Sequence, residues 1–180
     1  GLAPTGGYIA GRSELVAAAS YHLTAPGMGD ELGASLTSNR LLFQGFFLAP
    51  HIVAQALKGA VFAAGIFEGL GYHTFPRLED ERSDIIQAII LRNPERLKAF
   101  ARAIQSMSPV DSFAAPEPWD MPGYTDQIIM AAGTFVQGAS IELSADGPMR
   151  EPYAVYLQGA LSFEHAALGI MAAAEAVFET

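Results

Sequence analysis

The sequence contains no cysteine and only two lysines among its 180 residues. The absence of cysteine excludes disulfide bonds, thiolate metal sites and cysteine nucleophiles, and it fits a reducing compartment. Charged residues make up only 16% of the chain, and nineteen acidic residues against ten basic ones give a net charge of −9. Because lysine and arginine also form no run, we expect neither nucleic acid nor an anionic membrane surface as a partner.

Long hydrophobic runs are missing as well. The longest uncharged stretch, Leu41 to Leu57, is interrupted by Gln44, Pro50, His51 and Gln55. It therefore falls short of the roughly 20 apolar residues that a membrane-spanning helix requires. We interpret it as a buried helix of a soluble protein. No signal-peptide pattern opens the sequence, and we expect a cytoplasmic location.

Hydrophobic residues make up 51% of the chain, which is enough for a sizeable core in one domain, or in one domain and a fragment. The glycine-rich opening around Tyr8 to Ala10 predicts a turn into a strand. Ser13 is suited to cap a short helix. Apolar residues then recur at helical spacing over residues 42–64, which predicts a long helix that is buried along most of its length and kinked at Pro50.

The remaining sequence alternates between strand and helix patterns. The β-branched run over residues 84–91 predicts a strand covered on both faces. Asn93 and Pro94 predict the start of a helix whose apolar stripe continues to Met107, and Ser162 predicts the cap of a final helix. Three more strands are expected at 127–135, 140–146 and 153–159. The sequence thus predicts an α+β fold in which helices cover a small, mostly antiparallel sheet, preceded by the long kinked helix.

The sequence holds no complete catalytic motif of the common kinds. It lacks a G-x-S-x-G elbow, an H-E-x-x-H pair, a Walker A loop and a dinucleotide-binding glycine pattern. The four histidines are scattered, which favours surface or core roles over metal ligation. The two lysines, Lys58 and Lys98, both lie in predicted helices, and Lys98 falls opposite the apolar stripe of its helix. Solvated lysines therefore explain them better than a catalytic amine.

Arg150 is the cation with the most unusual sequence context, because it lies in a loop rich in glycine and proline between two predicted strands. A guanidinium in such a position can form a forked contact with a carboxylate. An ion pair with Glu151 or Asp146 that tightens the turn explains the same residue equally well. The sequence leaves both alternatives open.

The segment 108–126 is rich in proline and cannot form regular structure, yet it holds aromatic residues that long solvated linkers usually lack. We expect an ordered, functional loop. Trp119 and Tyr124 are suited to form the walls of a pocket, or only to pin the loop. The acidic residues of the loop could bind a hard cation, although no calcium-loop spacing supports this; they are Asp111, Glu117 and Asp120.

Several long strings of this sequence resemble one known family, that of the aluminium-resistance proteins, also described as methionine γ-lyase or cystathionine β-lyase-like proteins. The strings are GLAPTGGYIAGR, LTAPGMGDELGASLTSNRLLFQGFFLAPHIV, SPVDSFAAPEPWDMPGY and IMAAGTFVQGASIELSADGPMREPYAVYLQG. The resemblance extends from Gly1 to the last helix. It implies the C-terminal part of a fold type I enzyme that depends on pyridoxal 5'-phosphate (PLP). The implied divisions are 1–33 for the tail of the large cofactor domain, 34–70 for the connecting helix and 71–180 for the small domain.

The resemblance also assigns roles to individual residues. The Schiff-base lysine of the family precedes the stretch that matches Gly1, so this chain is expected to hold no catalytic residue of that kind. Thr5, Gly6 and Gly7 would lie on backbone that approaches the cofactor or a neighbouring subunit; without the resemblance, they read as a phosphate-binding loop or a plain turn. Arg150 lies roughly where fold type I enzymes bring an arginine to the substrate α-carboxylate, although their arginine usually lies within the following strand.

The implied function is that of a PLP-dependent carbon–sulfur lyase of the methionine γ-lyase or cystathionine β-lyase type, acting on a sulfur amino acid. The chain alone would be inactive, because the lysine would lie in the missing N-terminal part of the same protein. Fold type I relatives imply a homodimer or homotetramer. A function of a different class stays open, namely a non-catalytic binding or assembly module linked to tolerance of aluminium or another metal.

Overall fold

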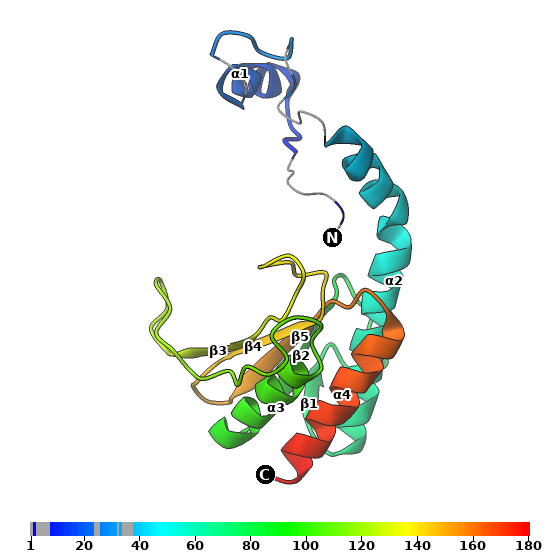
Figure 1. Cartoon of the computed structure of the whole chain (residues 1–180), viewed down its shortest axis with the longest axis vertical. Coiled ribbons are helices and arrows are strands. Elements are labelled where there is room, and N and C mark those ends of the chain that lie inside the picture. Colours follow the sequence, from blue (N-terminus) through cyan, green and yellow to red (C-terminus); the bar gives the residue numbers. More distant parts are fainter. Residues whose placement is uncertain (1, 3–7, 24–25, 32, 34–37) are drawn as a thin grey trace. The chain divides into compact units, whose positions relative to one another are not determined.

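The structure is a computed structural model of the chain, and it describes residues 2, 8–23, 26–31, 33 and 38–180 (Figure 1). The elements in chain order are α1 (Ser13–Leu23), α2 (Asn39–Gly69), β1 (His73–Phe75), β2 (Ile86–Ile90), α3 (Pro94–Ser106), β3 (Ile128–Ala131), β4 (Ser144–Pro148), β5 (Ala154–Gln158) and α4 (Phe163–Phe178). The chain forms two compact units, Gly1–Ala49 and Pro50–Thr180, which meet within α2. The expected divisions after residues 33 and 70 stay a prediction.

In the first unit, α1 begins at Ser13 as the sequence predicts. The expected strand at Tyr8–Ala10 is wrong, since these residues have no regular structure and are exposed. A strand is stable only when a neighbouring strand satisfies its backbone donors and acceptors, and no described residue of this unit belongs to a strand.

Helix α2 is confirmed as one long helix that contains Pro50. The expectation that it would be buried along most of its length is wrong. Its fully buried residues all lie between Ala56 and Phe67. In its first turns, by contrast, Phe43, Phe46 and Phe47 are 73%, 82% and 82% exposed. Helical periodicity identifies an apolar face but does not show how much partner surface exists to cover it.

Helix α2 also differs from the expectation that it is too short in apolar residues to span a membrane. By length and composition it is apolar enough to cross a membrane, with a mean hydropathy of 1.4 over 18 residues, despite the interruptions at Gln44 and Gln55. Only 22% of that window is buried. A single helix of this kind is weak evidence for a membrane span, because core helices of soluble proteins meet the same criteria.

The second unit is built on a five-stranded sheet with the order β1-β2-β5-β4-β3, in which every neighbouring pair is antiparallel (Figure 1). Helix α3 packs against β3, β4, β5 and α4. The core lies on this helical side, where Ile89, Ile129 and Val155 are fully buried together with Phe67 of α2 and Ile170 of α4. The predicted α+β architecture with a small antiparallel sheet is confirmed.

Several details of the strands differ from the prediction: β1 lies outside the expected strand segments, and β3 ends at Ala131 rather than at residue 135. Strand β2 is covered on one face only, since Gln87 and Ile89 are buried whereas Ile86 is exposed. Strand β4 begins at Ser144, after most of the expected segment 140–146. The reason is that the Glu142 carboxylate accepts hydrogen bonds from the backbone N–H groups of Phe135 and Val136, at 2.7 and 3.2 Å, and so holds the preceding segment as a loop.

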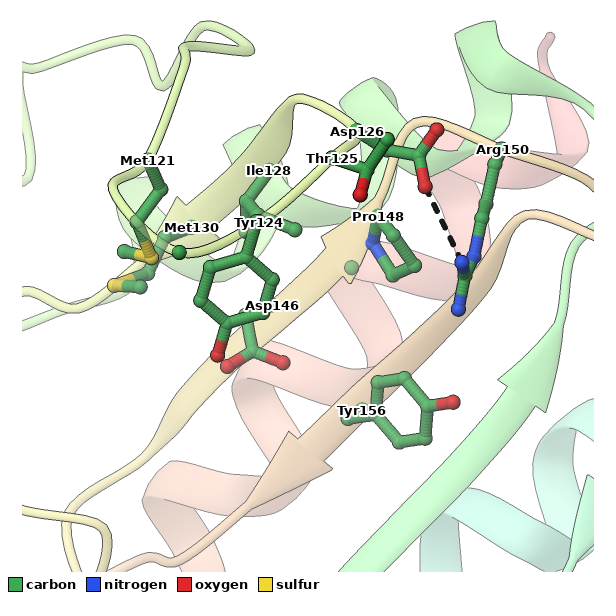
Figure 2. A pocket seen from close by; sticks show the side chains of 12 residues that line it. Met121, Tyr124, Thr125, Asp126, Ile128, Met130, Asp146, Pro148, Arg150 and Tyr156 are labelled. Carbon is green, nitrogen blue, oxygen red and sulfur yellow. Dashed lines mark hydrogen bonds and ion pairs between the residues drawn. The ribbon is translucent and has the colours of Figure 1, made fainter.

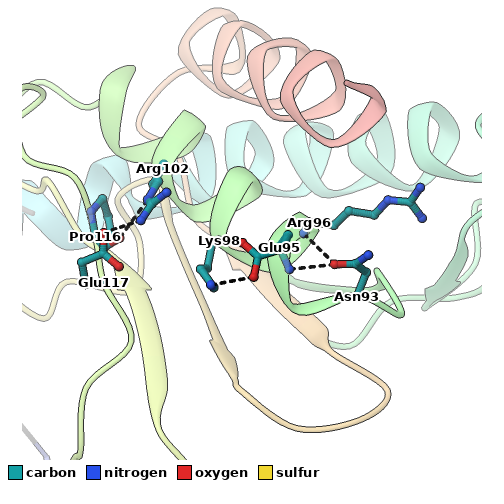
Figure 3. Close-up of polar contacts among 7 residues, drawn as sticks. All are labelled: Asn93, Glu95, Arg96, Lys98, Arg102, Pro116 and Glu117. Atoms are coloured by element: carbon teal, nitrogen blue, oxygen red, sulfur yellow. Dashed lines mark hydrogen bonds and ion pairs between the residues drawn. The ribbon is translucent and has the colours of Figure 1, made fainter. Parts of the chain in front are cut away.

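The helix caps predicted at Asn93 and Ser162 are confirmed, whereas Ser13 is the first residue within α1 and the carbonyl of Arg12 accepts the hydrogen bonds of its first turn. The side chain of Asn93 accepts hydrogen bonds from the backbone N–H groups of Glu95 and Arg96, at 2.7 and 3.4 Å (Figure 3). The hydroxyl of Ser162 accepts one from the N–H of His165 at 3.3 Å. These side chains satisfy donors that the first turn of a helix cannot pair internally.

Substitution of Phe67 provides a test of where the hydrophobic core lies. Its side chain is fully buried, and its ring centroid lies 5.5 Å from that of Phe100 and 5.8 Å from that of Tyr72. We expect Phe67→Ala to lower the free energy of unfolding by about 3–5 kcal/mol, because it removes apolar contacts and leaves a cavity. Urea denaturation followed by circular dichroism measures the change.

Phe178→Ala is the matched control, because the Phe178 ring on α4 is 80% exposed. We expect this variant to stay within about 0.5 kcal/mol of the wild type. Equal losses in the two variants would contradict a core on the helical side of the sheet.

Candidate functional site

The face of the sheet opposite to the helices carries a cavity of about 450 Å³ (Figure 2). Side chains of a strand alternate between its two faces, so the neighbours of the buried residues point into this cavity. In the paired register, Met130 of β3 lies opposite Asp146 of β4, and Asp146 lies opposite Tyr156 of β5. These three residues form one row across the sheet and make the floor of the cavity.

The loop before β3 forms one wall of the cavity, with Met121, Tyr124 and Asp126 among the lining residues. The end of this loop is fixed by two backbone hydrogen bonds between Trp119 and Ile128, of 3.0 and 3.1 Å. Tyr124 N–H donates to the carbonyl of Met121 at 3.1 Å, which turns the loop back over the sheet. The expectation of an ordered loop is therefore confirmed.

Strand β4 lies close to the core because of Gly147. A Cβ at this position would lie 2.6 Å from the carbonyl oxygen of Ala154 and 2.8 Å from a methyl carbon of Leu97. Both distances are too short for real contacts, so any side chain here would displace β4 from β5 or from α3. The glycine thus sets the position of its neighbour Asp146 in the cavity.

Arg150 lies in the β4–β5 loop at one end of the cavity, as the sequence predicts. Its Nη1 is 3.2 Å from Oδ2 of Asp126, and its side chain is 66% exposed. Of the two alternatives that the sequence left open, the ion pair with Glu151 or Asp146 is not formed, since Arg150 pairs with Asp126 instead. The reason is a backbone hydrogen bond of 2.8 Å from Met149 N–H to the carbonyl of Gln127, which brings the loop at Asp126 beside the arginine.

Asp146 lies apart from this ion pair, on the other side of the cavity in Figure 2. Within the described part of the chain, its carboxylate has no hydrogen bond and no ion pair. Burial raises the pKa of Asp146 above its ordinary value, because a carboxylate that loses water favours its neutral form. The cavity therefore holds a neutralised pair, Arg150 and Asp126, and a second carboxylate without a partner.

Apart from Tyr124, the other candidate residues of the described chain do not line this cavity. Thr5, Gly6 and Gly7 lie outside the described residues. Of the two alternatives for these aromatic residues, Tyr124 forms part of the cavity wall, whereas Trp119 holds the loop through its backbone pairing with Ile128. Lys98 Nζ contacts Glu95 Oε1 at 2.8 Å on the surface of α3 (Figure 3), and Lys58 is exposed on α2.

The acidic residues of the loop do not form a metal site. The carboxylate of Glu117 pairs with Arg102, which also donates from Nε to the carbonyl of Pro116 at 3.2 Å (Figure 3). Throughout the described ranges, no group of three or more His, Asp or Glu side chains could hold a metal ion. Asp111 and Asp120 are exposed.

A second cavity of about 230 Å³ lies beside the start of α4 and holds Glu142 and His165. The carboxylate of Glu142 is already bound by two backbone N–H groups, and Nε2 of His165 lies 2.8 Å from the carbonyl oxygen of Met107. Both polar groups therefore stabilise the local structure.

Comparison with known proteins identifies the class to which this α+β chain belongs. A family model described as methionine gamma-lyase matches residues 1–178. The chain belongs to this family. An uncharacterized protein, YnbB of Bacillus subtilis, is 50% identical over 179 residues, which cover 99% of this chain and 42% of YnbB. An uncharacterized 33.9 kDa protein of Lactobacillus delbrueckii is 48% identical, over 99% of this chain and 58% of that protein. The chain thus spans about half the length of these curated relatives.

Comparison with solved structures also supports membership of this family. A Listeria monocytogenes protein described as a "putative cystathionine beta-lyase involved in aluminum resistance" is 51% identical, with a TM-score of 0.93 over 98% of this chain and 44% of its own. A "carbon-sulfur lyase involved in aluminum resistance" from Clostridium novyi is also 51% identical, with a TM-score of 0.88 over 96% of this chain and 40% of its own. The predicted resemblance to the aluminium-resistance proteins is confirmed.

The environment of Asp146 predicts a pH-dependent effect on stability. A carboxyl whose pKa is raised in the folded state contributes most to stability below its unfolded pKa, near 3.8, and this contribution is lost as the pH rises through the folded pKa. Above its folded pKa, the charged Asp146 therefore opposes folding. We expect Asp146→Asn to be more stable than the wild type at pH 7, and we expect the difference to shrink as the pH falls toward 3.

Thermal unfolding of both proteins between pH 3 and pH 8 measures this difference. Asp120→Asn is the control, because Asp120 is exposed outside the cavity and the same substitution there should leave the pH dependence unchanged. A destabilised Asp146→Asn at pH 7 would show that the carboxylate has a favourable partner in the folded protein.

Proposed function

We propose that this chain is the C-terminal part of a PLP-dependent carbon–sulfur lyase that acts on a sulfur amino acid. The names of the solved relatives support a lyase, and the length of the relatives supports a longer protein. The proposal includes a fold type I arrangement, in which this chain forms the small domain and the connecting helix. It also includes a cytoplasmic homodimer or homotetramer.

The observation that carries the proposal is the position of Arg150. The guanidinium lies at the edge of a cavity of about 450 Å³, is largely exposed, and contacts Asp126 through a single nitrogen. Its other N–H groups are available to a ligand, and their planar arrangement matches both oxygens of a carboxylate. We assign Arg150 the binding of the substrate α-carboxylate.

The described residues of this chain do not fit the task of holding PLP. The coenzyme needs a lysine for its Schiff base, and among the described residues Lys58 is exposed on α2 while Lys98 is paired with Glu95. Neither lysine lines the cavity that holds Arg150. We therefore assign the coenzyme lysine to the preceding part of the protein. Thr5, Gly6 and Gly7 stay candidates for backbone contacts with PLP.

The contribution of this chain to the reaction is then to bind and orient the substrate. Arg150 fixes the carboxylate end. Met121, Met130 and Tyr156 line the cavity with apolar or aromatic surface, which suits a thioether because sulfur packs favourably against aromatic rings and other polarisable groups. Holding the substrate in one orientation raises the rate by removing its freedom before the bond breaks.

Substitution of Arg150 tests this role in the full-length protein. We expect Arg150→Met to raise KM for the amino-acid substrate about 10- to 100-fold, since charge-assisted hydrogen bonds of about 1.5–3 kcal/mol are lost. Arg150→Lys should lose less, because it keeps the charge but not the fork. Steady-state kinetics with detection of the released thiol measures both variants.

Arg102→Met is the matched control, because Arg102 is also a partly exposed arginine in an ion pair but lies outside the cavity. Its KM should match that of the wild type. An unchanged KM in Arg150→Met would contradict the assigned role. The absence of thiol release from any sulfur amino acid would contradict the proposed function as a whole.

The alternative of a metal-binding module makes a different prediction. Because the acidic loop residues do not converge on a common point in the structure, we expect calorimetry with Al³⁺ or Mg²⁺ to show no site that depends on them. The triple variant Asp111→Asn, Glu117→Gln, Asp120→Asn should give the same titration as the wild type. Tight binding that the triple variant loses would favour the alternative.

A further inference from the structure

We propose that a second copy of the chain docks on the outer side of α2 and α4, so that α4 of each copy lies along α2 of the other. We call this surface the α2–α4 face, and it consists of Lys58, Val61 and Gly65 of α2 with Leu168, Met171 and Glu175 of α4. The inference rests on the proposed homodimer or homotetramer, and it names the surface that joins the copies.

Helices α2 and α4 lie side by side within the second unit (Figure 1). Near the start of α4, the Phe163 N–H donates to Oε1 of Gln55 at 3.2 Å, and the ring centroids of Phe62 and Phe163 are 5.7 Å apart. Towards the C-terminal ends of both helices, a groove of about 430 Å³ lies between them and is lined by Gly65 and Met171 among others. The groove can receive side chains from another helix.

Helix α4 presents apolar residues on both of its faces. Ile170 and Val177 are fully buried in the core, whereas Leu168 and Met171 on the outward face are exposed. The outward face of a surface helix in a soluble protein is ordinarily polar. An apolar outward face beside a groove is typical of a surface that packs against another helix.

The residues of the α2–α4 face have matching spacing on the two helices. On each helix the three residues follow one another at intervals of three or four, which places them on one side of that helix. When α4 of one copy runs antiparallel to α2 of the other, Met171 lies beside Val61 and Leu168 lies over Gly65. The two helices therefore pair in one register over the whole face.

Gly65 supports this register, because nothing within one copy requires a glycine there. A Cβ at this position would come within 3.6 Å of a methyl carbon of Leu78, which is an ordinary contact. Gly59 differs, since its Cβ would lie 2.9 Å from that of Ala166, so packing inside one copy explains it. A glycine within a helix costs about 1 kcal/mol relative to alanine. The space that Gly65 leaves on the outer side is suited to the Leu168 side chain of a second copy.

The charges of the face favour a second copy over other partners. Lys58 lies at one end of the face and Glu175 at the other, and neither side chain has an ion pair within the described part of the chain. Glu175 lines the groove together with Gly69, which is eleven residues from Lys58 and so about 16 Å away along the helix axis. The two charges therefore do not meet within one copy.

A two-fold axis reverses the face of the second copy and brings each Lys58 to the partner's Glu175. Such self-complementarity is what a symmetric pair of identical surfaces requires. It matters here because the chain has a net charge of −9, so two copies repel one another unless opposite charges meet at their contact.

Charge reversal in the full-length protein tests the inference. We expect Lys58→Glu to weaken the association of copies at least about tenfold, because two attractive contacts become repulsive. The double variant Lys58→Glu, Glu175→Lys should regain the association of the wild type, since it exchanges the two charges. Size-exclusion chromatography with light scattering over a range of protein concentrations measures association, and circular dichroism checks that the variants are folded.

Lys98→Glu is the matched control, because it makes the same charge change at the other lysine of this chain, which lies on α3 and pairs with Glu95. It should associate as the wild type does. Unchanged association in Lys58→Glu would overturn the inference. A double variant that associates no better than Lys58→Glu would also overturn it, because the two charges would then not meet.

Cross-linking with a carbodiimide, which joins an amine to a carboxylate in contact with it, gives a second readout. In a mixture of unlabelled and isotope-labelled full-length protein, we expect cross-linked peptides that join Lys58 to Glu175 and combine both labels. Cross-linked peptides that always carry a single label would place the contact within one copy and overturn the inference.

Assembly and activity are measured separately, so this inference and the proposed lyase activity can fail independently. A protein that releases thiol but is monomeric at every concentration overturns the inference together with the proposed assembly, and it leaves the lyase activity in place. Association that is weakened in Lys58→Glu and regained in the double variant supports the inference even if no thiol is released.

Discussion

Alternation of side chains along β2 to β5 is the constraint on which the structure depends. Every second residue of these strands packs against α3, α4 and the second half of α2, and this packing forms the core. Because the period of a strand is two, burial of Ile129, Ala145 and Val155 places Met130, Asp146 and Tyr156 on the other face. The site is thus a consequence of the core, and a shift of one residue in register would bury the site residues.

The charged residues of the cavity, Arg150, Asp126 and Asp146, depend on the paired strands and their loops in different ways. Arg150 meets Asp126 because one backbone hydrogen bond joins the two loops that carry them. The pair is largely exposed on its arginine side, so it contributes little to stability. Asp146 has no such partner, and its burial opposes folding whenever it is charged. A carboxylate that destabilises its own fold is explained more readily by recognition of a ligand than by a structural role.

The helix caps could be predicted from the sequence, because they depend only on interactions between residues that are close in the sequence. Asn93 and Ser162 cap their helices through side chains that bind backbone two or three residues away, so the two caps could be predicted without the rest of the chain. The site required pairings between distant segments. Asp126 reaches Arg150 across 24 residues, and the register of β3, β4 and β5 brings Met130, Asp146 and Tyr156 together. The loop position of Arg150 could therefore be predicted from the sequence, whereas its pairing with Asp126 and the position of Asp146 in the cavity could not. The exposure of the first half of α2 was missed for a related reason, since periodicity does not show what covers a helix.

The charged residues of the cavity and the coenzyme lysine belong, in the proposed enzyme, to different parts of the protein. In the proposed enzyme, the bond-breaking chemistry belongs to the coenzyme and to the preceding part of the protein, whereas this chain supplies the surface that contacts the substrate. Asp146 lies on a strand whose position is set by Gly147 and by the core behind it, so its side chain can change without moving the backbone. Replacement of the carboxylate by a neutral group would remove the cost of its burial. Stability at neutral pH is therefore expected to change at this one position while the backbone of β4, which leads to Arg150, keeps its place.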